Sequence, residues 1–372
     1  MFYRAIGIMS GSSLDGLDIA FVEFQEQAGN WTYEILNADC YPYSPEWTDR
    51  LKNAIHLSAR EYQLLHSDYG HYTGQMVNKF IDAHQLQYKV AVIASHGHTT
   101  FHLPAQKMTA QLGDGAAIAA ETQLPVVSDL RALDVAFGGQ GAPIVPVGEK
   151  LLMSEYSYFL NIGGISNISV NTEPYIAFDI CPANRVLNML ANEAGKKYDD
   201  GGALAESGLV NMELLNKLNE QEYYQKPFPK SLANDFGTDT IFPLIKSFGL
   251  TTIDSLRTYT EHIAYQVKNS NKSCGLSAVQ AANQPETQTG FKLLCTGGGA
   301  LNSFLIKRIG ENLRELNIDT VVPDDKLVNY KEALIMAFIG VLRWRQEYNV
   351  LSSVTGSFRD SIGGALWIGQ EA

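Results

Sequence analysis

The sequence has 372 residues, a net charge of −12 and 45% hydrophobic residues, enough for one large or two ordinary domains with a sizeable core. The acidic balance leaves no broad basic surface, which argues against nucleic acid or an anionic membrane as a partner. The four cysteines stand far apart without a CxxC pair, and the longest uncharged apolar run, residues 333–342, is too short to span a bilayer. We therefore expect a soluble cytoplasmic protein with reduced thiols.

The first part of the chain predicts a sheet that begins with hairpins and continues with alternating helices and strands. Alternating or continuous apolar residues predict the strands, and longer periodic segments predict the helices. The expected strands are residues 3–9, 17–24, 31–43, 89–95 and 124–129, and the expected helices are 45–56, 59–85 and 114–122.

The second part repeats this order of elements without repeating the residues. The expected strands are residues 156–162, 165–170, 175–179, 292–296 and 320–322. Helices are expected at residues 184–194, from residue 301 onward, and at residues 331–347. Loops are expected at residues 199–208 and 280–290. The repeated order predicts two α/β lobes, each opened by a hairpin with a glycine turn, and a cleft between them. We expect the lobes to be residues 1–135, joined by the C-terminal helix, and residues 136–372.

Three glycine-rich turns are candidate phosphate-binding segments. They are "GIMSGSSLDGLD" at residues 7–18, Gly163-Gly164 in the second hairpin, and Gly297-Gly298-Gly299 before a helix. Glycine lets backbone N–H groups approach phosphate oxygens closely, and a helix N-terminus favours an anion. Each turn alone is more often an ordinary turn, but three of them at strand ends favour a nucleotide. No GxxxxGK[ST] or strand-linked GxGxxG occurs, which excludes a P-loop and a dinucleotide fold.

Asp179 is the leading candidate for a catalytic carboxylate. It stands at the end of an apolar strand, in "AFDICPANRVLN", directly before a helix. A carboxylate at the carboxyl end of a strand faces the side of an α/β sheet where ligands bind. The alternative is a capping or turn aspartate, and the same ambiguity holds for Asp114 and for the segment Asp129-Leu130-Arg131.

Three histidines and the glycine- and proline-rich segment 136–150 each have two interpretations. His96, His98 and His102 have a spacing that can ligate zinc, but no fourth ligand is evident, so hydrogen bonding to a ligand is favoured. Residues 136–150, "AFGGQGAPIVPVGEK", place Gln140 among glycines and prolines. This segment is either a mobile connection or a substrate loop.

Taken together, ordered motifs along nearly the whole chain resemble the anhydro-N-acetylmuramic acid kinase family, within the sugar kinase, Hsp70 and actin superfamily. The matching segments are "GIMSGSSLDGLD", "ASHGHTTFHLP", "QLGDGAAIA", "DLRALDVAFGGQGAPIVP", "NIGGISNIS", "FDICPAN", "YDDGGALAESG", "FPKSLANDFG", "TGGGALNSFL" and "KEALIMAF". The resemblance implies an α/β fold of two RNase H-like lobes, the actin-like ATPase fold, with a central nucleotide cleft.

The resemblance also implies a reaction and a homodimer. An enzyme of this family uses ATP and Mg²⁺ to open 1,6-anhydro-N-acetylmuramic acid with water and to phosphorylate O6, giving N-acetylmuramic acid 6-phosphate in peptidoglycan recycling. Asp179 occupies the position of the base that takes the proton of water.

Binding residues follow from the same motifs. The expected ATP-binding residues are Gly11, Ser12, Ser13, Leu14, Asp15, Gly16, Leu17, Asp18, Gly163, Gly164, Gly297, Gly298 and Gly299. Asp15 and Asp18 are expected to hold Mg²⁺ through water. The expected sugar-binding residues are His98, Asp114, Arg131, Gln140, Asn184 and Glu332.

Two departures from the family pattern bear on the choice of sugar. Ser12 replaces the usual threonine and keeps its hydroxyl. Ile180-Cys181-Pro182-Ala183-Asn184 replaces Thr-Gly-Pro-Gly-Asn, and the loss of two glycines predicts a change in how closely a sugar approaches the backbone. The alternatives are a kinase for another anhydro-sugar resembling levoglucosan, a kinase for an ordinary hexose, and a non-catalytic nucleotide-binding regulator.

Overall fold

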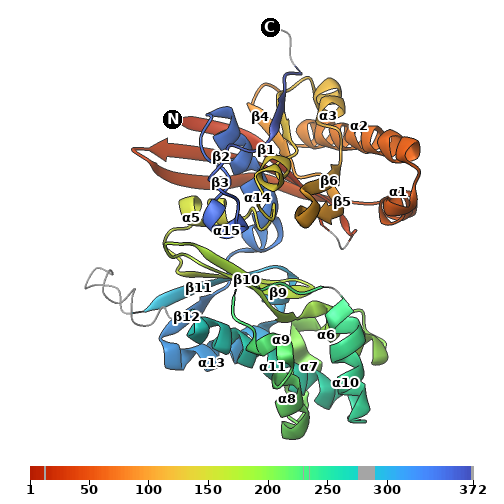
Figure 1. The fold of residues 1–372 in the computed structure, drawn as a ribbon, viewed down its shortest axis with the longest axis vertical. Coiled ribbons are helices and arrows are strands. Elements are labelled where there is room, and N and C mark those ends of the chain that lie inside the picture. The colour runs from red at the N-terminus through yellow and green to blue at the C-terminus, as the bar shows by residue number, and fades with distance from the viewer. Residues whose placement is uncertain (12–13, 229, 234, 275–289, 370–372) are drawn as a thin grey trace. The chain divides into compact units, whose positions relative to one another are not determined.

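The structure is a computed structural model that describes residues 1–11, 14–228, 230–233, 235–274 and 290–369 (Figure 1). The chain divides into two compact units. Unit 1 comprises Met1–Ser154 and Tyr330–Ala372, and unit 2 comprises Glu155–Asn329. The sequence predicts a boundary at residue 135, with the C-terminal helix as the one later element that joins the first lobe. The boundary lies later because Gly148 packs against Ile335, which keeps the segment after residue 135 with unit 1.

Unit 1 contains a six-stranded mixed sheet in the order β13-β7-β4-β1-β2-β3. β1 pairs antiparallel with β2 and parallel with β4, β2 pairs antiparallel with β3, β4 pairs parallel with β7, and β13 pairs antiparallel with β7. The strands are β1 (Phe2–Ser10), β2 (Gly16–Gln27), β3 (Asn30–Pro42), β4 (Val92–Ser95), β7 (Val126–Ser128) and β13 (Ala365–Trp367), and a separate hairpin consists of β5 (His98–Leu103) and β6 (Met108–Leu112).

The helices of unit 1 cover both faces of the central strand β1. Ile6 and Ile8 belong to a core cluster with Val77 and Phe80 of the long helix α2, whereas a side chain at Gly7 would collide with the Ala333 carbonyl of α14. Ser58 and Glu61 form a reciprocal capping box that starts α2. The helices are α1 (Pro45–Lys52), η1 (Ala54–His56), α2 (Ala59–Ala83), η2 (Pro104–Gln106), α3 (Gly115–Thr122), α4 (Ala132–Ala136), α5 (Pro146–Leu152), α14 (Asp325–Trp344) and α15 (Ser352–Thr355).

Unit 2 contains a five-stranded sheet in the order β10-β9-β8-β11-β12. Its first three strands are antiparallel, and β8, β11 and β12 are parallel. This is the same order and direction as β3-β2-β1-β4-β7, which confirms the predicted repetition of the element order and the mixed α/β class. The strands are β8 (Tyr158–Ile162), β9 (Ile165–Val170), β10 (Ile176–Pro182), β11 (Phe291–Thr296) and β12 (Ile318–Val321).

The helices of unit 2 pack around the fully buried side of α11, which contributes Tyr259, Ile263 and Val267 to the core. The expected loop at 199–208 is instead two short helices, η3 and α7, held by the Asp199 carboxylate, which accepts from the N–H groups of Leu204 and Ala205. The expected loop at 280–290 lies almost wholly outside the described residues. The helices are α6 (Asn184–Glu193), η3 (Asp200–Gly202), α7 (Ala203–Ser207), α8 (Met212–Asn219), α9 (Glu222–Gln225), η4 (Phe236–Ile241), α10 (Phe242–Ser247), α11 (Thr252–Ser273), η5 (Gly298–Leu301), α13 (Ser303–Leu313) and η6 (Arg314–Leu316).

In the part of the chain that the structure describes, no helix combines the length and the apolar character needed to cross a bilayer.

Candidate active site

The contacts of Gly11, Leu14 and Gly16 define the described part of the turn between β1 and β2. The N–H of Leu14 donates to the carbonyl of Gly11 at 3.3 Å, and Leu14 has a left-handed φ of 58°. A side chain at Gly16 would lie 2.6 Å from the carbonyl oxygen of Tyr41, so glycine is required there by packing alone. The expected ATP-binding residues Ser12 and Ser13 lie outside the described residues.

Three carboxylates near this turn influence one another. Burial raises the pKa of Asp18, a hydrogen bond from Cys40 lowers it, and the charge of Asp15 raises it again. Burial also raises the pKa of Glu332 in α14, where Lys331 acts in the opposite direction and Asp18 and Glu149 add to the increase. Burial is thus the main cause of both raised pKa values, and the neighbouring negative charges add to it.

Oxygen donors of this kind fit a hydrated Mg²⁺, which commonly uses only one or two carboxylates and keeps several waters. Among the residues that the structure describes, no group of three or more histidine, cysteine, aspartate or glutamate side chains could form a metal site. Any Mg²⁺ held by Asp15 and Asp18 would therefore keep much of its water shell.

A buried hydrogen-bonded network joins the end of β1 to the start of β5. Tyr43 donates its hydroxyl to the Ser10 Oγ at 2.7 Å, and it also lies 2.5 Å from the Tyr69 hydroxyl. The Ser10 Oγ lies 3.0 Å from the His98 Nδ1. The Ser10 hydroxyl thus connects Tyr43 to His98, and the tautomer of the imidazole sets which of Ser10 and His98 donates.

A pocket of about 260 Å³ in unit 1 contains two of the expected sugar-binding residues. It is lined by the end of β1 with Gly11, by His96, by His98 and Thr99 at the start of β5, by Arg131, and by residues 141–145. Burial lowers the pKa of His98, so the imidazole is neutral near pH 7. His98 and Arg131, which the sequence placed in separate motifs, thus lie in one pocket.

Asp114 and Gln140 have structural roles in unit 1. The Asp114 carboxylate accepts from the N–H of Ala116 at 2.9 Å and caps α3, which is the capping alternative for this residue. The side chain of Gln140 is exposed, and its N–H donates to the carbonyl of Thr355 at 2.7 Å. Neither residue is among those that line the pocket.

Asp179 lies on β10 of unit 2, beside a bulge in the pairing with β9 between Asp179 and Cys181. The N–H of Leu232 donates to the Asp179 Oδ2 at 2.8 Å, and the Asp179 N–H donates to the carbonyl of Lys230 at 3.2 Å. Burial raises the pKa of Asp179, and the hydrogen bond from Leu232 lowers it. One carboxylate oxygen is thus fixed by the backbone, and the group is more basic than an ordinary aspartate.

Two tyrosines hold the backbone around this carboxylate. The Tyr223 hydroxyl donates to the carbonyl of Asp179 at 2.7 Å, and the Tyr259 hydroxyl donates to the carbonyl of Pro182 at 2.7 Å. Both bonds reach across more than forty residues of sequence. They fix the two ends of the bulged segment, which orients Asp179.

The residues that replace threonine and the two glycines after Asp179 are buried. Ile180 is 1% exposed, and Cys181 and Ala183 are fully buried; all three belong to the core of unit 2. The Cys181 thiol lies 3.3 Å from the Ser166 hydroxyl. Their side chains are therefore packed inside the unit and do not cover the accessible side of the strand.

The turn at residues 297–299 contains glycines with different structural requirements. Gly297 has a φ of 78°, and a side chain there would lie 2.5 Å from the Asn161 Oδ1. A side chain at Gly299 would overlap Ile162. At Gly298 the nearest atom would be the Asn184 Nδ2 at 3.7 Å, so packing within the unit does not require glycine at this position.

Gly163 and Gly164 form the turn between β8 and β9 and have similar freedom. A side chain at either residue would meet no atom closer than 3.4 Å. Their carbonyl groups accept from the N–H groups of Asn184 and Ala183 at the start of α6. The Asn184 side chain donates to the carbonyl of Ile162 at 3.0 Å, so the expected sugar-binding residue Asn184 is bound to this turn by both its backbone and its side chain.

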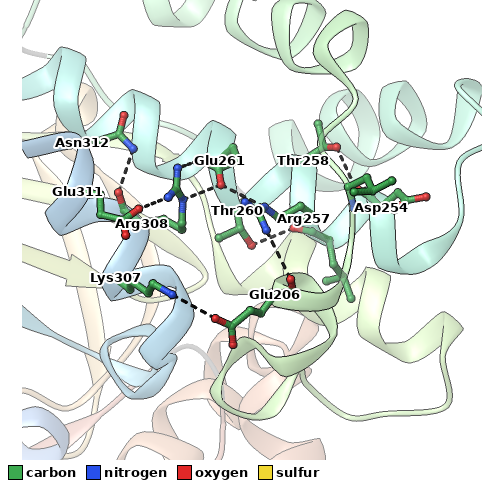
Figure 2. Close-up of polar contacts among 12 residues, drawn as sticks. Glu206, Asp254, Arg257, Thr258, Thr260, Glu261, Lys307, Arg308, Glu311 and Asn312 are labelled. Carbon is green, nitrogen blue, oxygen red and sulfur yellow. Dashed lines mark hydrogen bonds and ion pairs between the residues drawn. The ribbon is translucent and has the colours of Figure 1, made fainter.

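A network of ion pairs supports helix α13, which follows the turn at 297–299 (Figure 2). Glu261 of α11 is 9% exposed and accepts from Arg308 of α13 through both oxygens, at 2.7 and 3.0 Å. Arg257 donates to the same carboxylate at 3.2 Å, and Lys307 pairs with Glu206 of α7 at 3.2 Å. Paired and hydrogen-bonded charges of this kind fix the position of a helix.

Several site residues have no signal in the sequence. The N–H of Leu232 and the hydroxyl of Tyr223 contact Asp179 from distant segments, and any residue type except proline could supply the N–H. Tyr43 was expected only as a strand residue, although it donates to Ser10. The motif "FPKSLANDFG", which contains Leu232, was the one available indication that this segment lies near the site.

The family model and the curated relatives that match this chain by sequence agree on one family. A family model described as anhydro-N-acetylmuramic acid kinase matches residues 3–369. An anhydro-N-acetylmuramic acid kinase of Pasteurella multocida is 32% identical over 96% of this chain and 94% of its own length, and that of Francisella tularensis subsp. novicida is 32% identical over 95% of each chain. A solved structure, component A of (R)-2-hydroxyglutaryl-CoA dehydratase from Acidaminococcus fermentans, is 15% identical with a TM-score of 0.40 and covers 91% of this chain and 97% of its own.

Proposed function

The chain belongs to the anhydro-N-acetylmuramic acid kinase family, and from that premise we propose which reaction it catalyses and which residues carry it. It is an ATP-using sugar kinase. The proposed reaction converts 1,6-anhydro-N-acetylmuramic acid, water and ATP into N-acetylmuramic acid 6-phosphate and ADP. The observation that carries the mechanism is the half-buried Asp179 carboxylate with one oxygen fixed by a backbone N–H.

Asp179 is the proposed general base. Its free oxygen takes a proton from water as the water oxygen bonds to C1 of the sugar. The C1–O6 bond breaks, and O6 uses the released electron pair to bond to the γ-phosphorus as ADP leaves. Burial keeps the carboxylate basic enough to accept that proton, and the Leu232 N–H keeps it in one orientation.

The nucleotide contacts are proposed for residues 11–18 in unit 1 and for Gly163, Gly164 and Gly298 in unit 2. A side chain at any of these three glycines of unit 2 would make only ordinary van der Waals contacts, so packing does not require glycine there. This supports the assignment, because a phosphate needs close access to backbone N–H groups. Gly297 and Gly299 belong to the same turn as Gly298, but the backbone conformation and packing of the turn already require glycine at both positions. Mg²⁺, held through water by Asp15 and Asp18, would offset the charge of the phosphates.

The sugar contacts are proposed first for His98 and Arg131, because both line the pocket of unit 1. Glu332 and Asn184 are proposed as further contacts. Asp114 and Gln140 are proposed to support the sugar site indirectly. Asp114 does so by capping α3, and Gln140 by its backbone hydrogen bond to Thr355. The buried side chains of Ile180, Cys181 and Ala183 leave the accessible side of β10 clear, which supports a family substrate in spite of the replaced glycines.

The cellular location of the reaction is proposed from the family and from the free cysteine thiols. A cytoplasmic step of peptidoglycan recycling suits a protein in which all four cysteines are free. A homodimer is proposed from the family resemblance, and sedimentation equilibrium of the purified protein tests it.

The deciding experiment runs the reaction in ¹⁸O-water and analyses the phosphorylated sugar before anomeric exchange. We expect one solvent oxygen at C1. A phosphorylated product without that label would instead indicate phosphorylation of an ordinary sugar hydroxyl. A panel with levoglucosan and hexoses, read by ADP release, separates the alternatives: preference for levoglucosan indicates another anhydro-sugar kinase, and ATP binding without turnover indicates a regulator.

A further inference from the structure

The backbone of Asp179 is held by two residues that also contact each other. The Asp179 N–H donates to the carbonyl of Lys230 at 3.2 Å, and the Asp179 carbonyl accepts from the Tyr223 hydroxyl at 2.7 Å. The Lys230 ammonium group lies 4.8 Å from the centre of the Tyr223 ring and donates to the Tyr223 carbonyl at 3.4 Å. The three residues therefore form a closed set of contacts around the candidate base.

The segment that supplies these contacts lies at the edge of a sheet. β10 is an edge strand of unit 2, and residues 230–233, which are neither helix nor strand, contact this edge at Asp179. The Leu232 N–H of this segment donates to the Asp179 Oδ2. An irregular segment has no ladder of backbone hydrogen bonds to fix it, so side chains have to hold the Leu232 N–H in place.

Lys230 fastens this segment to an aromatic cluster that consists of Phe178, Tyr223 and Phe228. Its ammonium group lies 5.9 Å from the centre of the Phe178 ring, and that ring stacks on Phe228 at 5.5 Å. The face of an aromatic ring attracts a cation. Among the described residues, no carboxylate forms an ion pair with Lys230, and burial lowers its pKa below the usual range. The rings and the Tyr223 carbonyl are thus the partners of this cation.

The location of the ammonium group favours an indirect action on Asp179. Successive side chains of a strand point to opposite faces, so Phe178 and Asp179 face opposite sides of β10. The Lys230 ammonium group lies against Phe178, and it reaches Asp179 through its own backbone and through Tyr223. Lys230 is therefore placed to orient the base without sharing its proton.

We propose that Lys230 is a positioning residue for the reaction. Its ammonium group fastens residues 230–232 to the aromatic cluster, so that the Leu232 N–H keeps the Asp179 carboxylate directed at the attacking water. The inference rests on the proposed function, since it concerns the same base. A displacement of about 1 Å can cost about 10²-fold in rate, so this contact matters although it touches no reacting atom.

Lys230→Met tests the inference, because methionine keeps an unbranched apolar side chain and removes the charge. We expect kcat with 1,6-anhydro-N-acetylmuramic acid, measured by ADP release, to fall by about 10- to 100-fold. KM for the sugar, and ATP affinity measured by calorimetry, should stay within about twofold. Lys230→Arg should recover part of the loss, since a guanidinium also carries a charge over aromatic faces.

The pH profile of kcat/KM gives a second readout. Burial raises the pKa of Asp179 and the Leu232 hydrogen bond lowers it, so weakening this bond raises the pKa further. Because Asp179 accepts a proton only when it is deprotonated, the acid limb of Lys230→Met should lie at a higher pH than that of the wild-type protein. Burial raises the pKa values of the neighbouring Tyr223 and Cys181, which stay neutral in this range.

Lys226→Met is the matched control. Lys226 lies four residues earlier in the same connection between α9 and η4, and it pairs with the exposed Glu222 at 3.4 Å. Removing its charge should leave kcat and the acid limb unchanged. If Lys230→Met does not fold, as judged by circular dichroism, Lys230→Leu takes its place. Failure of both variants to fold would assign the charge to stability and overturn the inference.

Four further results, each with an active wild-type protein, would overturn the inference. The first is an unchanged kcat in Lys230→Met, and the second is a fall in kcat with an unmoved acid limb. The third is a loss carried mainly by KM or by ATP affinity, which would mean that Lys230 contacts the sugar or a phosphate directly. The fourth is an equal loss in Lys226→Met. In each case turnover by the wild-type protein leaves the proposed function standing, whereas absence of turnover with every anhydro-sugar overturns both.

Discussion

Asp179 combines two properties that a general base needs, a defined orientation and a raised affinity for a proton. The backbone N–H of Leu232 fixes one of its oxygens, and the Tyr223 hydroxyl fixes the carbonyl of the same residue. Burial accounts for the raised pKa. A carboxylate that is held on one side can present its other oxygen to water in a constant direction.

Replacing Asp179 by asparagine keeps the shape and removes the basicity. We expect turnover to fall by about 10²–10⁴-fold, the usual contribution of a general base, and ATP affinity to stay within about twofold, because the side chain is assigned to water and sugar. Steady-state ADP release and calorimetry measure the two quantities. Full activity of Asp179→Asn would remove this residue from the mechanism.

The pH dependence of kcat/KM should report the titration of Asp179. The base acts only when deprotonated, so activity is lost as the pH falls through the pKa of Asp179. Burial raises that pKa above the ordinary value of 3.8, and the acid limb should therefore lie at a higher pH than for an exposed aspartate. In Asp179→Asn the residual activity should lose this limb. A wild-type limb at or below the ordinary value would contradict the burial argument.

At the scale of elements, the turn between β11 and α13 contains two kinds of glycine. Packing requires glycine at two positions, and at the third position packing would allow a side chain. Gly297 has a left-handed backbone and close neighbours, whereas Gly298 has space around its Cα. The same turn is followed by α13, which the pairing of Glu261 with Arg308 holds in place (Figure 2). The turn is thus fixed by its surroundings and accessible at one residue.

Alanine substitutions at Gly297 and Gly298 should therefore differ. Gly297→Ala should lower the free energy of unfolding by about 1–3 kcal/mol, because a methyl group there meets the Asn161 side chain and the backbone is strained. Gly298→Ala should change it by less than about 1 kcal/mol but weaken ATP binding, because the methyl group occupies space assigned to phosphate. Denaturant titration and calorimetry test the pair. Normal ATP affinity in Gly298→Ala would move the phosphate elsewhere.

The strands and main helices could be predicted because their signal is local. The apolar run of β1 and the period of α2 are visible in the residues themselves. The β5–β6 hairpin was missed because its first residues, from His98 onward, are polar and suggested a ligand-binding loop. The segment of α7 was missed because its order depends on Asp199, a tertiary contact.

The features of the candidate site also divide into those that the local sequence predicts and those that it does not. The position of Asp179 at a strand end and the glycine turns follow from local sequence. The partners of Asp179 and the joining of Arg131 with His98 in one pocket do not, because they depend on contacts between segments far apart in the chain. Packing explains Gly297 and Gly299 without a ligand, a distinction that the run of three glycines does not reveal.

For the whole molecule, binding of nucleotide to the folded state should appear as stability. A ligand that binds only the folded protein adds about 2.7 kcal/mol at roughly a hundredfold excess over Kd, so saturating Mg·ATP should raise the melting midpoint. Asp179→Asn should show the same increase, since its defect is assigned to chemistry. A midpoint unchanged by Mg·ATP would count against nucleotide binding.

The division of the chain has a consequence for its synthesis. Unit 1 holds the first 154 residues but also needs residues after 329, which supply α14 against Gly7 and β13 at the sheet edge (Figure 1). All of unit 2 is translated before those residues, so it can fold before unit 1 is complete, against the usual order in which N-terminal domains fold first. Until α14 emerges, the face of β1 around Gly7 has no helix to cover it. The nascent N-terminal part therefore exposes an apolar strand face for longer than a domain of continuous sequence would.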